Sequence, residues 1–148
     1  ETAGAVKNVI ALAAGMCAGM KLGDNAMGSL LTRGLFEMSK LGEALGGNRL
    51  TFSGLSGMGD LATTCNSPNS RNRTVGERIG KGETLQQVLD SMVMVAEGVW
   101  TSRAVRELAA ELEIEMPITE AVCKILFENQ SPRLAVKELM DRQLKAED

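Results

Sequence analysis

The chain has 148 residues, of which 44% are hydrophobic and 24% are charged, as is usual for one globular domain with a buried core. Its formal net charge is −3 and only 3% of its residues are aromatic, so it lacks both the basic field and the stacking side chains of a nucleic-acid-binding protein. Histidine is absent and Cys17, Cys65 and Cys123 are far apart, which predicts free thiols in a reducing cytoplasm and argues against a disulfide framework or a metal site.

Residues 2–20 predict a helix that is apolar or small on every side, and such a helix is normally buried by its neighbours. The run is long enough to suggest a membrane span. Lys7, Asn8, the glycines and the preference for Ala over Leu favour a core helix instead. The chain starts with Glu1 and passes directly into this run, so we interpret it as the carboxyl-terminal part of a longer protein.

Lys7 is the one charged residue in this apolar run. A buried ammonium group costs free energy unless it is paired, and lysine is a side chain that can serve as a catalytic acid or base. The alternative is that Lys7 reaches water from near the start of the helix. The sequence favours neither interpretation over the other.

A second helix is predicted from Asp24 to about Leu45, with apolar residues at the three-and-four spacing of one buried face. Asp24 is the predicted N-cap, and we interpret Asp24 and Asn25 as a cap and not as a site. Gly46 and Gly47 are predicted to end the helix.

Residues 57–62, Gly-Met-Gly-Asp-Leu-Ala, match the loose dinucleotide pattern G-x-G-x-x-A. That pattern has meaning only between a buried strand and a helix, and residues 52–56 do not predict a strand. We therefore expect a turn into a short helix, about 58–66, with Asp60 in its first turn. The helix dipole alone would favour a carboxylate there, so Asp60 by itself does not indicate a site.

Ser70-Arg71-Asn72-Arg73 follows a proline-containing loop and predicts the start of a helix that ends at Gly80 or Gly82. A serine cap, free N–H groups and an arginine together suit an anion, and phosphate is the natural ligand. The alternative is a solvated basic helix end, whose arginines and Lys81 simply face water.

The remaining chain predicts further helices and no repeat. Residues 93–100 could be taken for a strand, but the run is isolated, so a loop or the start of a helix is the better prediction. The expected features are a capping box at Thr84 for a helix to about Met92, a cap at Thr101 or Ser102 for a helix to about Leu112, a stop at Pro117 before a helix over Thr119–Glu128, and a start at Ser131-Pro132 for a helix to about Lys145. The predicted fold is a single all-α domain.

At several of these motifs the chain resembles a known family. The runs Ala5-Val6-Lys7-Asn8-Val9, Gly23-Asp24-Asn25, Leu31-Thr32-Arg33-Gly34, Gly57-Met58-Gly59-Asp60-Leu61 and Ser70-Arg71-Asn72-Arg73 are similar, in this order, to the carboxyl-terminal domain of the NAD(P)-dependent glycerol-3-phosphate dehydrogenases. The spacing and the Ser-Arg-Asn-Arg form resemble the bacterial branch. The resemblance extends over nearly the whole chain.

The resemblance implies that residues 1–148 form one multi-helix domain, similar to the carboxyl-terminal fold of 6-phosphogluconate dehydrogenase, and that an amino-terminal Rossmann domain is absent from this chain. It implies interconversion of dihydroxyacetone phosphate and sn-glycerol 3-phosphate with NAD or NADP, in the cytoplasm, feeding glycerophospholipid synthesis. The implied partners are this phosphorylated substrate and the Rossmann domain, and a homodimer stays open. Neither a nucleic-acid partner nor a membrane span is expected.

The family's residue roles carry over by position. Lys7 would be the catalytic acid/base and would also bind substrate, and Asp60 would bind substrate and hold Lys7. The other implied contacts are Thr64, Ser70, Arg71 and Asn72 with the substrate, and Arg71, Val95 and Glu97 with the cofactor. The chain departs from the family at Met27, where a basic residue is common. Without a nucleotide-binding domain we expect weak substrate binding at most and no turnover.

Two other functions stay open on the sequence. One is the helical domain of a related hydroxyacid or sugar-acid dehydrogenase, which would prefer a carboxylate substrate. The other is a non-catalytic helical interaction module.

Overall fold

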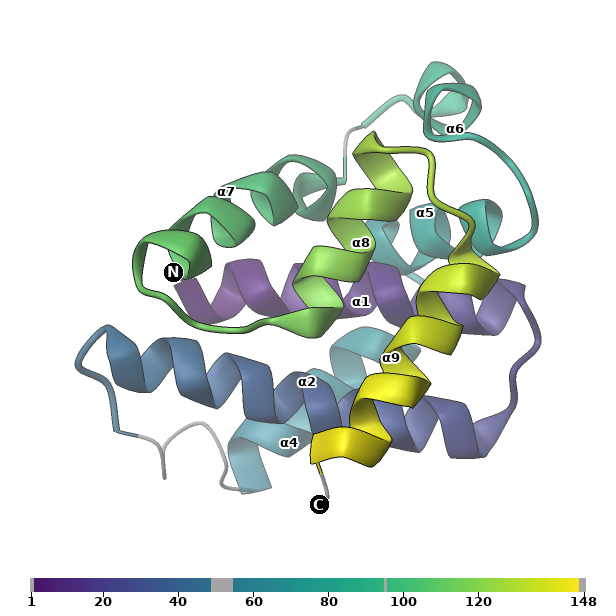
Figure 1. The fold of residues 1–148 in the computed structure, drawn as a ribbon. Coiled ribbons are helices and arrows are strands. Elements are labelled where there is room, and N and C mark those ends of the chain that lie inside the picture. Colours follow the sequence, from purple (N-terminus) through teal and green to yellow (C-terminus); the bar gives the residue numbers. More distant parts are fainter. Residues whose placement is uncertain (1, 49–54, 95, 147–148) are drawn as a thin grey trace.

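The computed structural model describes residues 2–48, 55–94 and 96–146, and every regular element within these ranges is a helix (Figure 1). This confirms the all-α prediction. The helices are α1 (Thr2–Gly19), α2 (Asp24–Ala44), α4 (Leu55–Asn66), α5 (Arg71–Gly80), α6 (Leu85–Ser91), α7 (Glu97–Glu111), α8 (Pro117–Phe127) and α9 (Pro132–Ala146).

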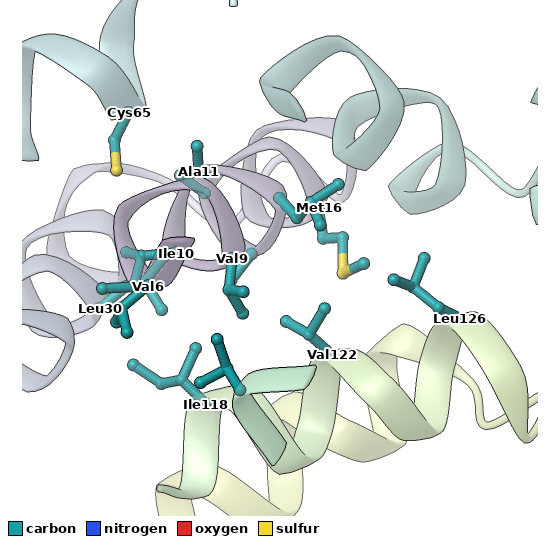
Figure 2. Packing of buried hydrophobic residues seen from close by; sticks show 14 of the residues in the cluster. Val6, Val9, Ile10, Ala11, Met16, Leu30, Cys65, Ile118, Val122 and Leu126 are labelled. Carbon is teal, nitrogen blue, oxygen red and sulfur yellow. The ribbon is translucent and has the colours of Figure 1, made fainter. Parts of the chain in front are cut away.

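Helix α1 is the centre of the structure. It packs against α2, α4, α5, α7 and α8, and 61% of its residues are buried. Figure 2 shows Val9 and Met16 of α1 facing Val122 and Leu126 of α8. In length and composition α1 could cross a membrane, but its burial by five other helices is what a core helix requires.

Glycines let α1 and α5 approach each other backbone to backbone. A Cβ atom added at Gly15 or Gly19 of α1, or at Gly76 or Gly80 of α5, would lie only 2.0–2.3 Å from a main-chain carbonyl oxygen of the other helix. No other residue fits at such a distance, so these four positions fix how far apart the two helices lie. This pair has the most extensive contact in the described structure.

Several predicted helix boundaries are confirmed. Ser70 caps α5 by accepting a hydrogen bond from the Arg73 N–H, and Thr84 forms a complete capping box with Gln87. Gly46 has a φ of 90°, the left-handed conformation in which glycine commonly ends a helix, and α2 ends just before it.

Four predicted starts were wrong by a few residues. Asp24 is the first residue of α2, and its N-cap is Gly23, which has a φ of 90°. Thr101 and Ser102 do not cap α7, because the helix already begins at Glu97; their hydroxyl groups donate to carbonyl oxygens of the preceding turn. A serine or threonine hydroxyl can cap a helix or can donate to a carbonyl oxygen inside one. The sequence alone does not distinguish these two positions.

Helix α4 begins at Leu55, three residues before the predicted start, so Asp60 lies in its second turn and not in its first. The G-x-G-x-x-A pattern therefore falls inside a helix. A nucleotide fingerprint would lie at the turn between a strand and a helix, so this pattern is not one. Pro117 does not precede α8 but is its first residue, a position where the missing proline N–H costs nothing. The next N–H group, from Ile118, donates to the buried carboxylate of Glu37 in α2 at 2.6 Å.

The basic residues in and just after α5 are partly exposed, as one interpretation expected, but they also form ion pairs. Arg73 and Lys81 both pair with Glu77, at 3.6 and 3.3 Å, and Arg78 forms a two-bond pair with Glu83. Arg71 is thus left as the exposed cation at the beginning of this helix.

Candidate functional site

Lys7 and Asp60 form an ion pair between α1 and α4. Lys7 Nζ donates to Asp60 Oδ2 at 2.5 Å, and the two side chains are 24% and 61% exposed. Lys7 is therefore both paired and within reach of solvent, which combines the two interpretations that the sequence left open. Because Asp60 lies outside the first turn of α4, the helix dipole does not explain a carboxylate at this position. The ion pair with Lys7 does explain it.

The other two helix segments that carry predicted site residues, the starts of α5 and α7, lie close to Asn8, the residue that follows Lys7. Gly98, at the start of α7, lies so close to α1 that an added Cβ would be 2.9 Å from the carbonyl oxygen of Asn8. Its N–H donates to Asn72 Oδ1 at 2.9 Å in a buried hydrogen bond. Asn72 thereby joins the start of α5 to the start of α7, beside the residue that follows Lys7.

The start of α5 offers groups for an anion. Arg71 and Asn72 are its first two residues, and their N–H groups have no partner within the helix because no preceding turn exists. Ser70 Oγ accepts from Arg73 N–H, and Ser70 O accepts from Thr74 N–H, so the next two N–H groups are satisfied. The exposed Arg71 side chain adds a full positive charge to the partial charge of the helix start.

The remaining predicted residues are placed as follows. Thr64 lies one turn after Asp60 in α4, and its Oγ1 donates to the Asp60 carbonyl oxygen at 2.8 Å. Glu97 is exposed and is the first residue of α7. Val95 lies outside the described residues. The structure therefore brings the predicted substrate residues and Glu97 to neighbouring helix segments around the start of α1.

Two large cavities of the described residues lie away from this site. They have volumes of about 480 and 490 Å³ and lie between α2, α7, α8 and α9, and neither is lined by a predicted site residue. The nearby thiol of Cys65 in α4 offers no nucleophile, since burial raises its pKa to about 12, although Arg73 opposes the shift.

The sequence interpretation missed two features that position the site. One is Gly98, whose N–H binds Asn72; a single glycine at a helix start carries no signal that would identify it. The other is the glycine contact between α1 and α5, and here a signal was present. Gly15 and Gly19, like Gly76 and Gly80, are four residues apart on one helix face, the spacing that permits close helix packing.

Comparison with known proteins gives a consistent result. The family described as "NAD-dependent glycerol-3-phosphate dehydrogenase C-terminus" matches residues 1–137. The chain is 55% identical to "Glycerol-3-phosphate dehydrogenase [NAD(P)+] 1" of Salinibacter ruber over 148 residues, and 51% identical to "Glycerol-3-phosphate dehydrogenase [NAD(P)+]" of Staphylococcus aureus over 147 residues. These matches cover 100% and 99% of the chain but 43% and 44% of the relatives, so the chain spans less than half of their length.

Solved structures agree. The glycerol-3-phosphate dehydrogenase of Coxiella burnetii is similar with a TM-score of 0.89 and 42% identity, over 95% of this chain and 43% of that one. The yeast glycerol-3-phosphate dehydrogenase is similar with a TM-score of 0.80 and 27% identity, over 90% of this chain and 39% of that one.

Proposed function

Because the chain belongs to the family of glycerol-3-phosphate dehydrogenase carboxyl-terminal domains, we propose that it is the substrate domain of an enzyme that interconverts dihydroxyacetone phosphate and sn-glycerol 3-phosphate with NAD or NADP. The observation that carries the proposal is the Lys7–Asp60 ion pair on α1, next to Asn8, where the joined starts of α5 and α7 reach the same helix. A proton donor and a phosphate anchor are the two groups that reduction of a phosphorylated ketone requires of such a domain.

Lys7 is the proposed acid/base. In the direction of ketone reduction its ammonium group donates a proton to the carbonyl oxygen, and in the reverse direction the neutral amine takes a proton from the hydroxyl group. Asp60 holds the Lys7 side chain through the 2.5 Å hydrogen bond and so keeps Nζ in one place. When bound, the nicotinamide supplies or accepts the hydride.

The start of α5 is the proposed phosphate anchor. Arg71 can meet a phosphate through two hydrogen bonds, next to the free N–H groups of the helix start. Asn72 uses Oδ1 to hold Gly98, which leaves its amide nitrogen to donate to the substrate. Ser70, which shapes the helix start, and Thr64 complete the proposed substrate contacts.

The chain's own residues can contact only a part of the cofactor. Within the described ranges there is no strand on which a dinucleotide fold could be built, and the glycine-rich pattern lies inside α4. Arg71 and Glu97 are exposed at two helix starts that the Asn72–Gly98 bond joins, and these, together with Val95, are the proposed cofactor contacts. We propose that a separate nucleotide-binding domain holds the rest, and that this chain alone does not turn over substrate.

The test joins this chain to the amino-terminal part of the Salinibacter ruber relative, in place of the part that it matches, and follows oxidation of NADH and NADPH with dihydroxyacetone phosphate. We expect turnover by the hybrid and a loss of about a hundredfold to ten-thousandfold in kcat for Lys7→Ala. Lys137→Ala, an exposed lysine of α9, is the matched control. Full activity of Lys7→Ala would assign the acid/base role to another group.

A second arm tests the substrate class. If the hybrid reduces keto acids and not dihydroxyacetone phosphate, the anchor at Arg71 binds a carboxylate and the phosphate assignment is wrong. The proposed reaction supplies sn-glycerol 3-phosphate, the backbone of glycerophospholipids, and we place it in the cytoplasm, where the three free cysteines would stay reduced.

A further inference from the structure

A cavity of about 490 Å³ lies between α2, the segment that leads into α8, and α9, and it shares no residue with the candidate site. Its apolar wall includes Phe36, which is 51% exposed, and Pro117. Three cationic side chains line it: Arg33 and Lys40 from α2, and Arg142 from α9. The cavity thus combines a hydrocarbon surface with positive charge.

The positive charge is only partly balanced. Arg142 pairs with Glu115 at 2.6 Å. Lys40 Nζ donates to the Glu115 carbonyl oxygen at 3.4 Å and lies over the Phe36 ring, 5.5 Å from its centroid. Arg33, one turn before Glu37, makes no hydrogen bond or ion pair with any residue that the structure describes. With Glu37 ionised, the five charged residues that line the cavity leave one net positive charge.

Glu37 makes this balance dependent on pH. The side chain lines the cavity but is only 1% exposed, and Oε1 accepts from the Ile118 N–H while Oε2 has no hydrogen-bond partner. Burial raises the pKa of Glu37 to about 7; the N–H groups at the start of α8, Arg33 and Lys40 oppose that shift. The other charged groups of the cavity are Glu115, before α8, and Arg142, on α9. Protonation of Glu37 therefore adds one positive charge to the cavity at mildly acidic pH.

We propose that this cavity binds a small amphipathic anion, a carboxylate on a short hydrocarbon body, with the carboxylate at Arg33 and Lys40 and the hydrocarbon against Pro117 and the part of Phe36 that Lys40 leaves exposed. A guanidinium group matches a carboxylate with two parallel hydrogen bonds. An unpaired guanidinium beside an exposed phenyl ring thus offers both parts of such a ligand a contact. An anion without the hydrocarbon body would gain nothing from the apolar wall, and an amphipathic cation would meet like charge.

The test titrates octanoate into the 148-residue chain by calorimetry, with hexanoate, octylammonium and inorganic phosphate as comparisons. We expect octanoate to bind one to one and hexanoate to bind about tenfold more weakly, because each buried methylene contributes about threefold to fourfold in affinity. Octylammonium and phosphate should show no saturable binding. Equal binding of octanoate and octylammonium would overturn the proposal, since it would show that the charges do not select the ligand.

Variants locate the site. Arg33→Gln should weaken octanoate binding by about tenfold, as loss of a charge-assisted contact does. Lys137→Gln removes the same charge from an exposed position of α9 that does not line the cavity, and should change binding less than twofold. Equal effects of the two variants would refute the site. Should Arg33→Gln lose the helical circular-dichroism signal of the parent, Lys40→Gln takes its place with the same expected loss.

Glu37→Gln gives an independent signature. It keeps the oxygen that accepts from Ile118 N–H but can carry no negative charge. The parent chain should bind octanoate several-fold more tightly at pH 6 than at pH 8, whereas the variant should bind equally at both. A pH dependence that persists in Glu37→Gln would mean that the anion does not lie in this cavity.

Discussion

The glycine contact between α1 and α5 makes a sharp prediction about Gly76. An alanine Cβ at this position would lie 2.0 Å from the Leu12 carbonyl oxygen. Ordinary carbon–oxygen contacts are about 3.3 Å, so α5 would have to move by about 1.3 Å. The backbone of α5 fixes the position of this Cβ, and the oxygen belongs to the backbone of α1, so no side-chain rotation can relieve the contact. We expect Gly76→Ala to strain the centre of the structure.

The magnitude follows from two opposing terms. Overpacking of a rigid core costs about 3 kcal/mol at the upper end of its usual range, and replacing glycine by alanine within a helix returns about 1 kcal/mol. Gly76→Ala should thus lower the free energy of unfolding by about 2 kcal/mol. Gly28 in α2 has no atom within 4 Å of an added Cβ, so Gly28→Ala should raise stability by up to about 1 kcal/mol.

Urea unfolding of both variants, followed by far-ultraviolet circular dichroism, measures the difference. The two substitutions make the same chemical change in two helices, so about 3 kcal/mol between them reports the close approach and not helix propensity. If Gly76→Ala is as stable as Gly28→Ala, α1 and α5 do not approach backbone to backbone. In the hybrid enzyme, Gly76→Ala should also raise the KM for dihydroxyacetone phosphate, because α5 carries Arg71.

Three further predictions concern stability. Burial raises the pKa of Glu37 from 4.5 to about 7. The stability that this group contributes is therefore complete below pH 4.5 and falls by about 3 kcal/mol as the pH rises through 7. Urea unfolding from pH 4.5 to 8 should show this fall, and Glu37→Gln should lack it. Asp60→Asn should change stability by less than about 1 kcal/mol, because its ion pair with Lys7 is partly exposed. The same variant should impair turnover by the hybrid. A larger loss of stability would contradict the exposed geometry of the pair. Asn72→Ala leaves the Gly98 N–H buried without an acceptor and should cost about 1–3 kcal/mol in the same unfolding assay, whereas no change would show that the bond is dispensable.

A fourth prediction belongs with these and concerns thiol chemistry. Burial raises the pKa of all three cysteine thiols, so none should react with a thiol-specific disulfide reagent at pH 8 in the folded chain, and all three should react after unfolding in urea. Rapid reaction of one thiol in the native state would indicate that its helix opens locally.

Local signals allowed much of the fold to be predicted from the sequence. The buried face of α2, the caps at Ser70 and Thr84, and the proline at the start of α9 depend on residues within a few positions of each other, and the structure has all of them. Three of the four wrong starts have a shared cause. At Asp24, Thr101 and Pro117 a polar residue or a proline could serve as a cap or as a member of the first turns, and tertiary contacts decide between the two.

The candidate site was predictable only as a set of residues. Resemblance gave Lys7, Asp60 and Arg71 together, but no sequence rule states that α1 and α4 meet where Lys7 can bind Asp60. The contact between Asn72 and Gly98 spans 26 positions, and the one between Glu37 and Ile118 spans 81. Pairings at such separations are set by how the helices pack, which depends on the whole core and not on any one motif.

The Ser-Arg-Asn-Arg motif shows why a site of this kind needs a compact helix start. Consecutive helical residues point in directions about 100° apart, so neighbours in the sequence serve different sides of the molecule. Ser70 closes the first turn, Arg71 faces solvent, Asn72 faces inward to Gly98, and Arg73 pairs with Glu77. The inward bond of Asn72 orients the helix start, and the outward Arg71 can then hold an anion without itself being anchored. A loop carrying the same four residues would supply the charge but not the fixed direction, because nothing would tie its backbone to α7.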